Sequence, residues 1–333
     1  MKKCLVIRIA AFGDAICITP IFPLLKQDGY HITVSTSQRG KQVLLNNPYI
    51  DAFHDHDETI PATDALTEYW KNLSKGYDKV INLTESIEGS LSKAEGRPEF
   101  NWPKEERHAE CNVNFYDRTL EFAGYSDIKG KNGELYFTSE EESIAKNFRR
   151  KRKDKFIIVW SLSGSAFHKT YPYAEYVAEV FSKRHNNILF LTVGDDLSRL
   201  LEFNLSNTYK TCGKWSFRRS MIMPKYADLV IGTDTGMMHA AGCFDVPKIL
   251  MLSANTEENL SKYWKNCINL SADAECQPCH RLIYTLKACP TDNNNLILGH
   301  YPICMSRLDA KTVLNAIEEV YDKWQSQHNQ HYH

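Results

Sequence analysis

Residues 229–239, with the sequence LVIGTDTGMMH, decide the fold more than any other stretch of the chain. The first three residues form an apolar run without alternation, which is typical of a central strand covered on both faces. The two glycines permit a tight turn against a bound molecule, and a helix is expected from Met237 onward. Because polar groups at the carboxyl end of such a strand face a ligand crevice, we predict a binding site between Asp234 and His239. An ordinary turn in which Asp234 caps the helix is the alternative.

A second crevice motif lies at the start of the chain. Residues 4–9 (CLVIRI) predict another buried strand, residues 11–14 (AFGD) a turn, and residues 15–27 a helix. Asp14 is therefore expected at a helix N-terminus, where it either faces the crevice or caps the helix, and Gly13 allows close approach of the backbone. A secretory signal peptide is an alternative for this region, but charged residues interrupt its apolar run.

Length, charge and cysteine content narrow the class of protein. The 333 residues exceed one typical core, so two domains are expected. The 40 basic and 41 acidic residues give no electrostatic footprint for nucleic acid. Because no uninterrupted apolar stretch could span a membrane, we expect a cytoplasmic protein with at most peripheral contact at the inner face of the membrane. Ten cysteines without a secretion signal are typical of reduced thiols or metal ligands rather than of disulfides.

Strand and helix patterns alternate along the chain, which is typical of α/β folds with parallel sheets and crossover helices. The strands are expected at about 3–9, 31–36, 50–53, 78–83, 156–161, 188–193, 228–232 and 247–252. The helices are expected after Gly13, Gln38 and Pro61, and over residues 109–124, 139–155, 172–184, 196–204, 216–226 and 237–243. This pattern predicts two doubly wound halves with a cleft between them.

A polar, glycine-bearing stretch near residues 126–138 marks the expected domain boundary. The expected units are a first domain over 1–135, a second over 136–308, a C-terminal helix over 309–325 and a tail over 326–333. The helix could pack back on the first domain. The tail contains three histidines, which could bind a metal, but its composition is more typical of disordered surface.

Four segments of the chain together resemble a known family. They are IRIAAFGDAICITP at 7–20, HKTYP at 168–172, ADLVIGTDTGMMHAAGCFDVP at 227–247, and the closing CQPCH with GHYPICM. Taken together they resemble the ADP-heptose:lipopolysaccharide heptosyltransferases, glycosyltransferase family 9, over nearly the whole chain. The resemblance implies a GT-B fold with two Rossmann-like doubly wound parallel-sheet domains facing a cleft. It also implies an acceptor-binding first domain, a nucleotide-sugar-binding second domain, and an inverting transfer without a catalytic metal or other cofactor.

The resemblance implies catalytic roles for two residues. Asp14 matches the proposed general base, which would take the proton of the acceptor hydroxyl. Lys169 matches the lysine that contacts the diphosphate, where fixed donors stabilise the leaving group. Ser163 and Ser165 stand where the family has hydroxyl ligands to phosphate. A plain loop with a solvated lysine is the alternative reading of this segment.

Further residues are expected to bind the donor, which the resemblance predicts to be ADP-heptose. Asp234 and Thr235 should bind sugar hydroxyls or phosphate, and the backbone N–H groups of Gly236 and Met237 should help to neutralise the diphosphate. His239 is either a ligand or a packed helix histidine. Asp195 could bind the ribose hydroxyls, although the family's ribose glutamate is not matched in this sequence.

Four cysteines lie close together in a turn-rich segment near the C-terminus. They are Cys276, Cys279, Cys289 and Cys304. A CxxC pair followed by two more cysteines is a reasonable four-cysteine metal pattern, although the spacing is irregular for a zinc ribbon. Some relatives that glycosylate proteins are thought to carry iron or zinc in such a segment. A structural Zn or Fe site is therefore one interpretation, and free buried thiols are the other.

The acceptor is the least defined partner. Residues 85–110, where lipid-linked acceptors usually meet basic side chains, contain seven glutamates against four lysines and arginines. Because like charges repel, this region fits phosphorylated lipopolysaccharide poorly, and a glycan, a lipid-linked glycan or a protein is expected as acceptor. A GT-B nucleotide-sugar epimerase and a non-catalytic nucleotide-sugar-binding protein are the competing classes. A dinucleotide-dependent dehydrogenase is disfavoured, since no GxGxxG follows either first strand.

Overall fold

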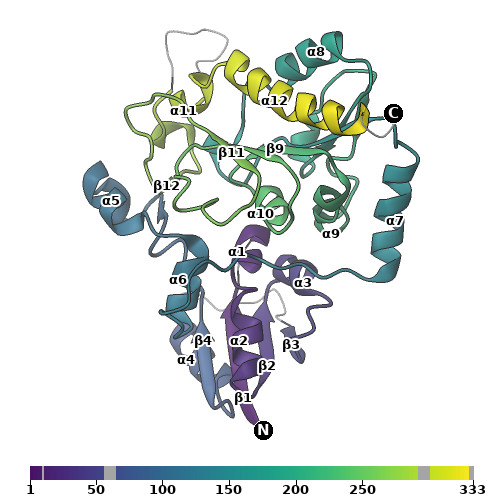
Figure 1. The fold of residues 1–333 in the computed structure, drawn as a ribbon. Coiled ribbons are helices and arrows are strands. Elements are labelled where there is room, and N and C mark those ends of the chain that lie inside the picture. Colours follow the sequence, from purple (N-terminus) through teal and green to yellow (C-terminus); the bar gives the residue numbers. More distant parts are fainter. Residues whose placement is uncertain (10, 56–64, 292–300, 330–333) are drawn as a thin grey trace.

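In the computed structural model, the described residues form two large parallel β-sheets, one below the other in Figure 1, and a small third sheet of two strands. The structure describes all residues except 10, 56–64, 292–300 and 330–333. We call the first sheet and the helices that connect its strands the first lobe, and the second sheet with its helices the second lobe. Helices α1 and α10 meet between the two lobes (Figure 1).

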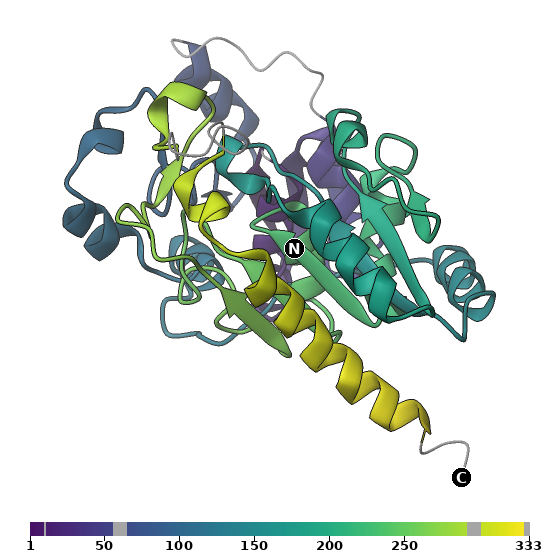
Figure 2. The same cartoon turned by 90° about the horizontal axis from the view of Figure 1, so that it is seen from above.

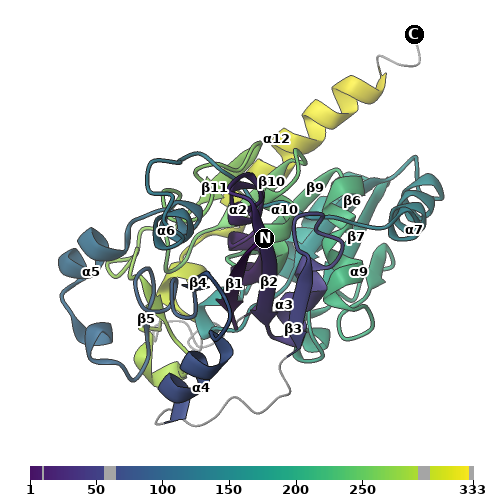
Figure 3. The same ribbon diagram turned by 90° about the horizontal axis from the view of Figure 1, so that it is seen from below.

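The first sheet has the strand order β3-β2-β1-β4, and all its neighbouring strands are parallel (Figure 3). Its strands are β1 (Lys2–Arg8), β2 (Tyr30–Thr36), β3 (Ala52–Asp55) and β4 (Lys79–Asn82). Its helices are α1 (Phe12–Cys17), α2 (Ile21–Gln27), α3 (Gln38–Leu44) and α4 (Leu66–Leu73). The single helix expected over 15–27 is therefore wrong, because Pro20 lacks the N–H group that would continue α1.

The second sheet has the strand order β11-β10-β9-β6-β7-β8, again with parallel neighbours. Its strands are β6 (Phe156–Ser161), β7 (Ile188–Val193), β8 (Thr208–Lys210), β9 (Leu229–Thr233), β10 (Lys248–Met251) and β11 (Cys267–Leu270). Trp160 of β6 packs into the core on one face of this sheet, and its neighbour Val159 packs into the core on the other. Both faces are covered, which explains the apolar runs without alternation.

The helices of the second lobe and of the segment that leads into it begin and end as follows. They are α5 (Lys104–Cys111), α6 (Phe115–Phe122), α7 (Ser139–Arg150), α8 (Ala174–Arg184), α9 (Phe217–Met221), α10 (Gly236–Gly242), α11 (Ile303–Ser306) and α12 (Ala310–Asn329). Short 3₁₀ helices span Pro98–Asn101, Phe167–Lys169, Leu197–Leu201, Met223–Tyr226 and Leu286–Ala288.

Besides the helix expected over 15–27, three more expected helices are divided or shorter in the structure. The helix expected over 109–124 is two helices, because the side chain of Asn114 accepts a hydrogen bond from Tyr116 N and starts α6 anew. The helix expected over 196–204 is only the short 3₁₀ turn Leu197–Leu201. The helix expected over 216–226 is split at Ile222, where α9 ends and a 3₁₀ turn containing Pro224 follows.

The C-terminal helix packs on the second lobe and not on the first, which corrects the expectation from the sequence. Helix α12 runs beside α8, and Figure 2 shows it in yellow over the second lobe. The Tyr321 hydroxyl donates to Asn187 at 2.7 Å, and the Trp324 indole N–H donates to Asp228 at 3.0 Å. The helix continues to Asn329, so residues 326–329 are not a disordered tail, while 330–333 lie outside the described residues. Within the described chain, no helix is long and apolar enough to cross a membrane.

A strap that follows β4 joins the first lobe to the cysteine-rich segment of the second. Strand β5 (Lys93–Ala94) pairs in parallel with β12 (Arg281–Leu282). The carboxylate of Glu95 accepts hydrogen bonds from the backbone N–H groups of Tyr284 and Thr285 at 2.8 and 3.0 Å. Several basic and acidic side chains of the region expected to meet the acceptor therefore hold the two lobes together.

Buried Arg218 of α9 makes a second connection between the lobes. Its guanidinium donates to the backbone carbonyls of Gln42 and Leu45, at the end of α3, at 3.0 and 3.3 Å. It also pairs with Glu141 of α7 at 2.6 Å. The side chain is 8% exposed, so these partners replace the water that the guanidinium loses.

Candidate functional site

The two turns predicted from the sequence meet where the lobes touch. A Cβ atom added to Gly13 would lie 2.9 Å from Cδ2 of His239, and one added to Gly236 would lie 2.9 Å from Cβ of Phe12. The ring of Phe12 stacks on that of Phe217, with 3.8 Å between centroids. Gly236 therefore makes room for the other lobe, whereas the sequence analysis assigned the space to a bound molecule.

A cavity of about 500 Å³ lies between the lobes, within the range typical of small-molecule sites. It is lined by every residue that the sequence analysis assigned to catalysis or to donor binding. These are Gly13, Asp14, Ser163, Ser165, Lys169, Asp195, Asp234, Thr235, Gly236, Met237 and His239. The ends of β1, β6, β7 and β9 thus open into one space, as expected for the carboxyl ends of parallel strands.

Asp234 organises the charged groups on the second-lobe side of this cavity. One of its carboxylate oxygens pairs with the Lys169 Nζ at 3.1 Å and accepts a hydrogen bond from the Asn255 amide at 3.0 Å. The other oxygen lies 3.2 Å from the His239 Nε2. Asp234 is 7% exposed, so the carboxylate is almost fully enclosed by these partners.

The ionisation of this cluster leaves one positive charge in excess. Burial alone would raise the pKa of Asp234, but Lys169 and His239 outweigh it and hold that pKa far below its ordinary value. Burial alone would lower the pKa of His239, but contacts with Cys17 and Asp234 raise it to about 10. Because burial raises the pKa of the Cys17 thiol, that thiol is neutral, and we attribute the protonation of His239 to Asp234. Two cations therefore face one carboxylate, which suits an anionic ligand such as a diphosphate.

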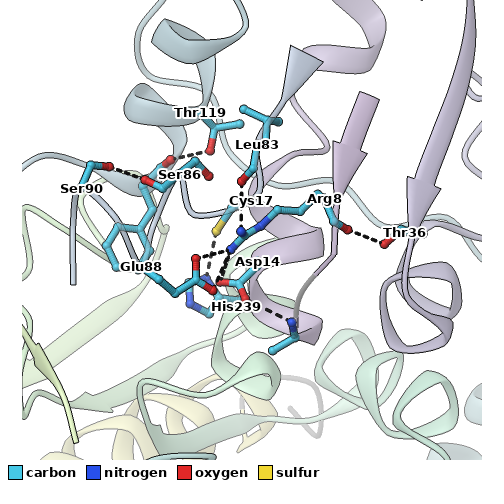
Figure 4. Close-up of polar contacts among 12 residues, drawn as sticks. Arg8, Asp14, Cys17, Thr36, Leu83, Ser86, Glu88, Ser90, Thr119 and His239 are labelled. Atoms are coloured by element: carbon cyan, nitrogen blue, oxygen red, sulfur yellow. Dashed lines mark hydrogen bonds and ion pairs between the residues drawn. The ribbon is translucent and has the colours of Figure 1, made fainter. Parts of the chain in front are cut away.

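Asp14 lies on the first-lobe side of the cavity, in the first turns of α1 (Figure 4). Its Oδ1 pairs with the Arg8 guanidinium at 3.2 Å, and its Oδ2 accepts a hydrogen bond from the backbone N–H of Ala11 at 3.2 Å. The carboxylate thus also makes the capping contact considered as the alternative. The two roles are compatible, because the Asp14 side chain is 19% exposed and lines the cavity.

Several polar residues of the cavity wall already bond to protein partners. The Ser163 hydroxyl lies 2.8 Å from that of Ser198, which in turn donates to Asp195 at 2.8 Å. Thr235 caps α10, and its hydroxyl lies 3.0 Å from that of Ser161. A ligand that reaches these groups would have to share or replace these bonds. Asp196, next to Asp195, does not line the cavity, and 80% of its side chain is exposed.

Several residues of the site were not predicted from the sequence. Arg8 and Glu88 flank Asp14, Asn255 holds Asp234, and Arg281 of β12 and Tyr284 just after that strand line the cavity. Arg8 could have been predicted to belong to the site, because a charged residue inside the apolar run CLVIRI needs a buried partner. The other residues come from segments without a motif, so only the fold brings them to the cavity.

The four cysteines near the C-terminus line one small hollow, separated from the main cavity by His168, which lines both. All four thiols are free, and burial raises the pKa of each, for example that of Cys279 to about 11. Among the described residues, no three His, Cys, Asp or Glu side chains are placed so that they could hold a metal ion. The four thiols therefore line the same hollow but are not arranged to coordinate a metal ion in this structure.

Comparison with solved structures shows the same fold. A family 9 glycosyltransferase from Veillonella parvula superimposes with a TM-score of 0.65 and 15% identity, covering 96% of this chain and 97% of that one. The E. coli ADP-heptose LPS heptosyltransferase II gives 0.65 and 13%, covering 98% and 100%. The iron-containing dodecameric glycosyltransferase TibC from enterotoxigenic E. coli gives 0.59 and 11%, covering 97% and 77%. These structures confirm the expected GT-B fold with its two parallel sheets. No curated protein matches the chain in sequence.

The sequence also matches a family model directly. The model of glycosyltransferase family 9 (heptosyltransferase) matches residues 66–288, which include Lys169 and the segment 229–239. The match covers more than half of the chain. The cavity, which is lined by Asp14 of the first lobe and by Lys169 of the second, is consistent with membership of this family. The chain therefore belongs to glycosyltransferase family 9, the heptosyltransferase family, and is a glycosyltransferase.

Proposed function

We propose that this enzyme transfers heptose from ADP-heptose, with inversion, to a hydroxyl of a glycan, a lipid-linked glycan or a protein. The observation that carries the proposal is the shared cavity, because Asp14 from one lobe and Lys169 from the other line the same space. The first lobe would bind the acceptor and the second the donor. The neighbouring E. coli enzyme, named as an ADP-heptose heptosyltransferase, supports the choice of donor.

The proposed reaction is a single displacement at the anomeric carbon. Asp14 accepts the proton of the acceptor hydroxyl while the hydroxyl oxygen forms the new bond to the sugar. The bond from the anomeric carbon to the diphosphate breaks, and its electron pair leaves with ADP. Lys169 and protonated His239 stabilise the charge that develops on the leaving group, and Asp234 holds both cations in place.

Three further residues are proposed to bind the nucleotide. The hydroxyls of Ser163 and Ser165 would contact the phosphates, and Asp195, which lines the same cavity, would accept from the ribose. Binding the ribose would leave Asp195 in contact with Ser198, since a carboxylate can accept several hydrogen bonds.

For the cysteine hollow we propose a structural Zn or Fe ion around which the four thiols draw together. Four thiols that line one hollow have the donor chemistry of such ions, and TibC, of the same fold, is described as iron-containing. Metal analysis of the purified protein should find about one ion per chain, and Cys276→Ser should lose it while Cys267→Ser, outside the hollow, keeps it. A metal-free, fully folded protein would contradict this part of the proposal.

Calorimetric titration with ADP-, GDP- and UDP-sugars tests the proposed function. We expect binding of ADP-heptose, weaker binding by Lys169→Met, and unchanged binding by Lys183→Met, whose exposed side chain pairs with Glu179 away from the cavity. Asp14→Asn should bind the donor as the wild type does but fail to release ADP in the presence of acceptor. Full turnover of Asp14→Asn would refute its role as base, and preference for another nucleotide would refute the donor.

A further inference from the structure

Two carboxylates share one buried guanidinium at the first-lobe wall of the cavity. The Nη2 atom of Arg8 lies 3.2 Å from the Asp14 Oδ1 and 3.1 Å from the Glu88 Oε2 (Figure 4). Its Nη1 donates to the carbonyl of Leu83 at 3.0 Å, which fixes the plane of the guanidinium. Glu85, three residues before Glu88, is instead held by Arg97 at 2.7 Å.

The shared guanidinium is sealed from water while the two carboxylates are not. Arg8 is 1% exposed, whereas the side chains of Asp14 and Glu88 are 19% and 28% exposed. Burial alone would lower the pKa of Arg8, but the two carboxylates raise it, so the guanidinium stays charged. Two carboxylates therefore face one cation, and one negative charge is in excess at this wall.

We infer that Glu88 is a positioning residue. Because Glu88 and Asp14 both pair with the Arg8 guanidinium, Glu88 weakens the hold of Arg8 on Asp14 and keeps the Asp14 carboxylate a good proton acceptor. The inference deepens the proposed function, since it rests on Asp14 as the base. An arginine committed to Asp14 alone would stabilise the carboxylate and weaken it as a proton acceptor. Glu88 opposes this effect in two ways, because it competes for the guanidinium and because its own charge repels that of Asp14.

The arrangement also suits the product of proton transfer. When Asp14 accepts the acceptor proton it becomes neutral, and Arg8 keeps Glu88 as its counter-ion. The buried arginine is therefore not left without a counter-ion, which would be strongly unfavourable if Asp14 were its only carboxylate partner. The proton moves from the acceptor oxygen to an Asp14 oxygen, and Glu88 takes part only through its charge.

Other charged or titratable groups also face Asp14. They are Cys17 on α1, His239 on α10, and Tyr284, which follows β12 and lies near both carboxylates. Glu88→Gln leaves these side chains in place, and of the three only Tyr284 has a pKa that the charge of Glu88 raises. Glu88→Gln keeps the size of the side chain and removes only its charge, so it isolates the effect that we infer.

The pKa of the Asp14 carboxyl can be measured without any substrate. Carbon-13 NMR of protein labelled at the aspartate carboxyl carbons gives the titration midpoint, with Asp14→Asn to assign the signal. We expect Glu88→Gln to move the midpoint of Asp14 to lower pH by about one unit. Glu88→Asp should restore most of the wild-type midpoint, and Glu106→Gln, on exposed α5, should leave it unchanged. An unchanged midpoint in Glu88→Gln would overturn the inference.

A kinetic measurement separates this inference from the proposed function. The acid limb of the pH profile for ADP release from ADP-heptose should move to lower pH in Glu88→Gln, with a lower maximal rate. If Asp14→Asn is inactive but the limb of Glu88→Gln does not move, only the role of Glu88 is wrong. If Asp14→Asn is fully active, the proposed base is wrong, and the NMR midpoint still decides whether Glu88 shifts the pKa of Asp14.

Discussion

Replacing Gly13 by alanine tests whether the two lobes meet as closely as the structure shows. The added Cβ would lie 2.9 Å from Cδ2 of His239, and His239 cannot move aside easily. Its ring is held by Asp234 at 3.2 Å and lies against those of Phe115 and Trp264. Overpacking of this kind lowers the free energy of unfolding by about 1–3 kcal/mol. Alanine offsets about 0.4–1 kcal/mol of this loss, because it restricts the unfolded chain more than glycine does.

The net loss of about 1–2 kcal/mol should lower the melting temperature by a few degrees. A double-mutant cycle identifies the cause, because His239→Ala removes the atoms that the new methyl group meets. In that background Gly13→Ala should no longer destabilise, and it should stabilise slightly, since φ at this position is not left-handed. Thermal unfolding followed by circular dichroism measures all four proteins. An equal loss in both backgrounds would refute the contact between Gly13 and His239.

Three further predictions follow from the charges that connect the lobes. Because Asp234 raises the pKa of His239 above its ordinary value, the positive charge of His239 is present at neutral pH and is lost as the pH rises into the alkaline range. ADP affinity should fall over that range, and calorimetry should find a weaker dependence in His239→Gln; an identical dependence would argue against a charged His239. Arg218→Met should destabilise the fold by about 2–3 kcal/mol, because three backbone carbonyls lose a buried donor, whereas exposed Arg219→Met should not; equal melting temperatures would contradict this. Glu95→Gln should speed amide hydrogen exchange over 281–288, and unchanged exchange would show that the strap does not depend on this carboxylate.

The parallel strands and the cavity could be predicted because their signals are local. An apolar run that ends in small and polar residues marks a buried strand and its carboxyl end, and both 4–9 and 229–239 have this form. Since the carboxyl ends of neighbouring parallel strands meet at one edge, residues such as Ser163 and Asp234 could be placed in one crevice before their distance was known.

What the sequence could not predict depends on contacts between distant segments. Glu88 reaches Arg8 across 80 residues, and although Arg8 stands out as a charge inside an apolar run, no motif marks Glu88 as its partner. Gly236 has the signature of a turn glycine, but the requirement for it comes from Phe12 on the other lobe. The C-terminal helix has an apolar face that could cover either lobe, and only partners such as Asp228 decide which one it covers.

The central claim is that Asp14 and Lys169 act on the same nucleotide sugar from opposite walls of one cavity. A crystal structure of the protein with ADP-heptose tests this most directly. We predict a diphosphate oxygen within hydrogen-bond distance of the Lys169 Nζ and an anomeric carbon that faces the Asp14 carboxylate. A nucleotide bound outside this cavity, or a sugar turned away from Asp14, would contradict the account.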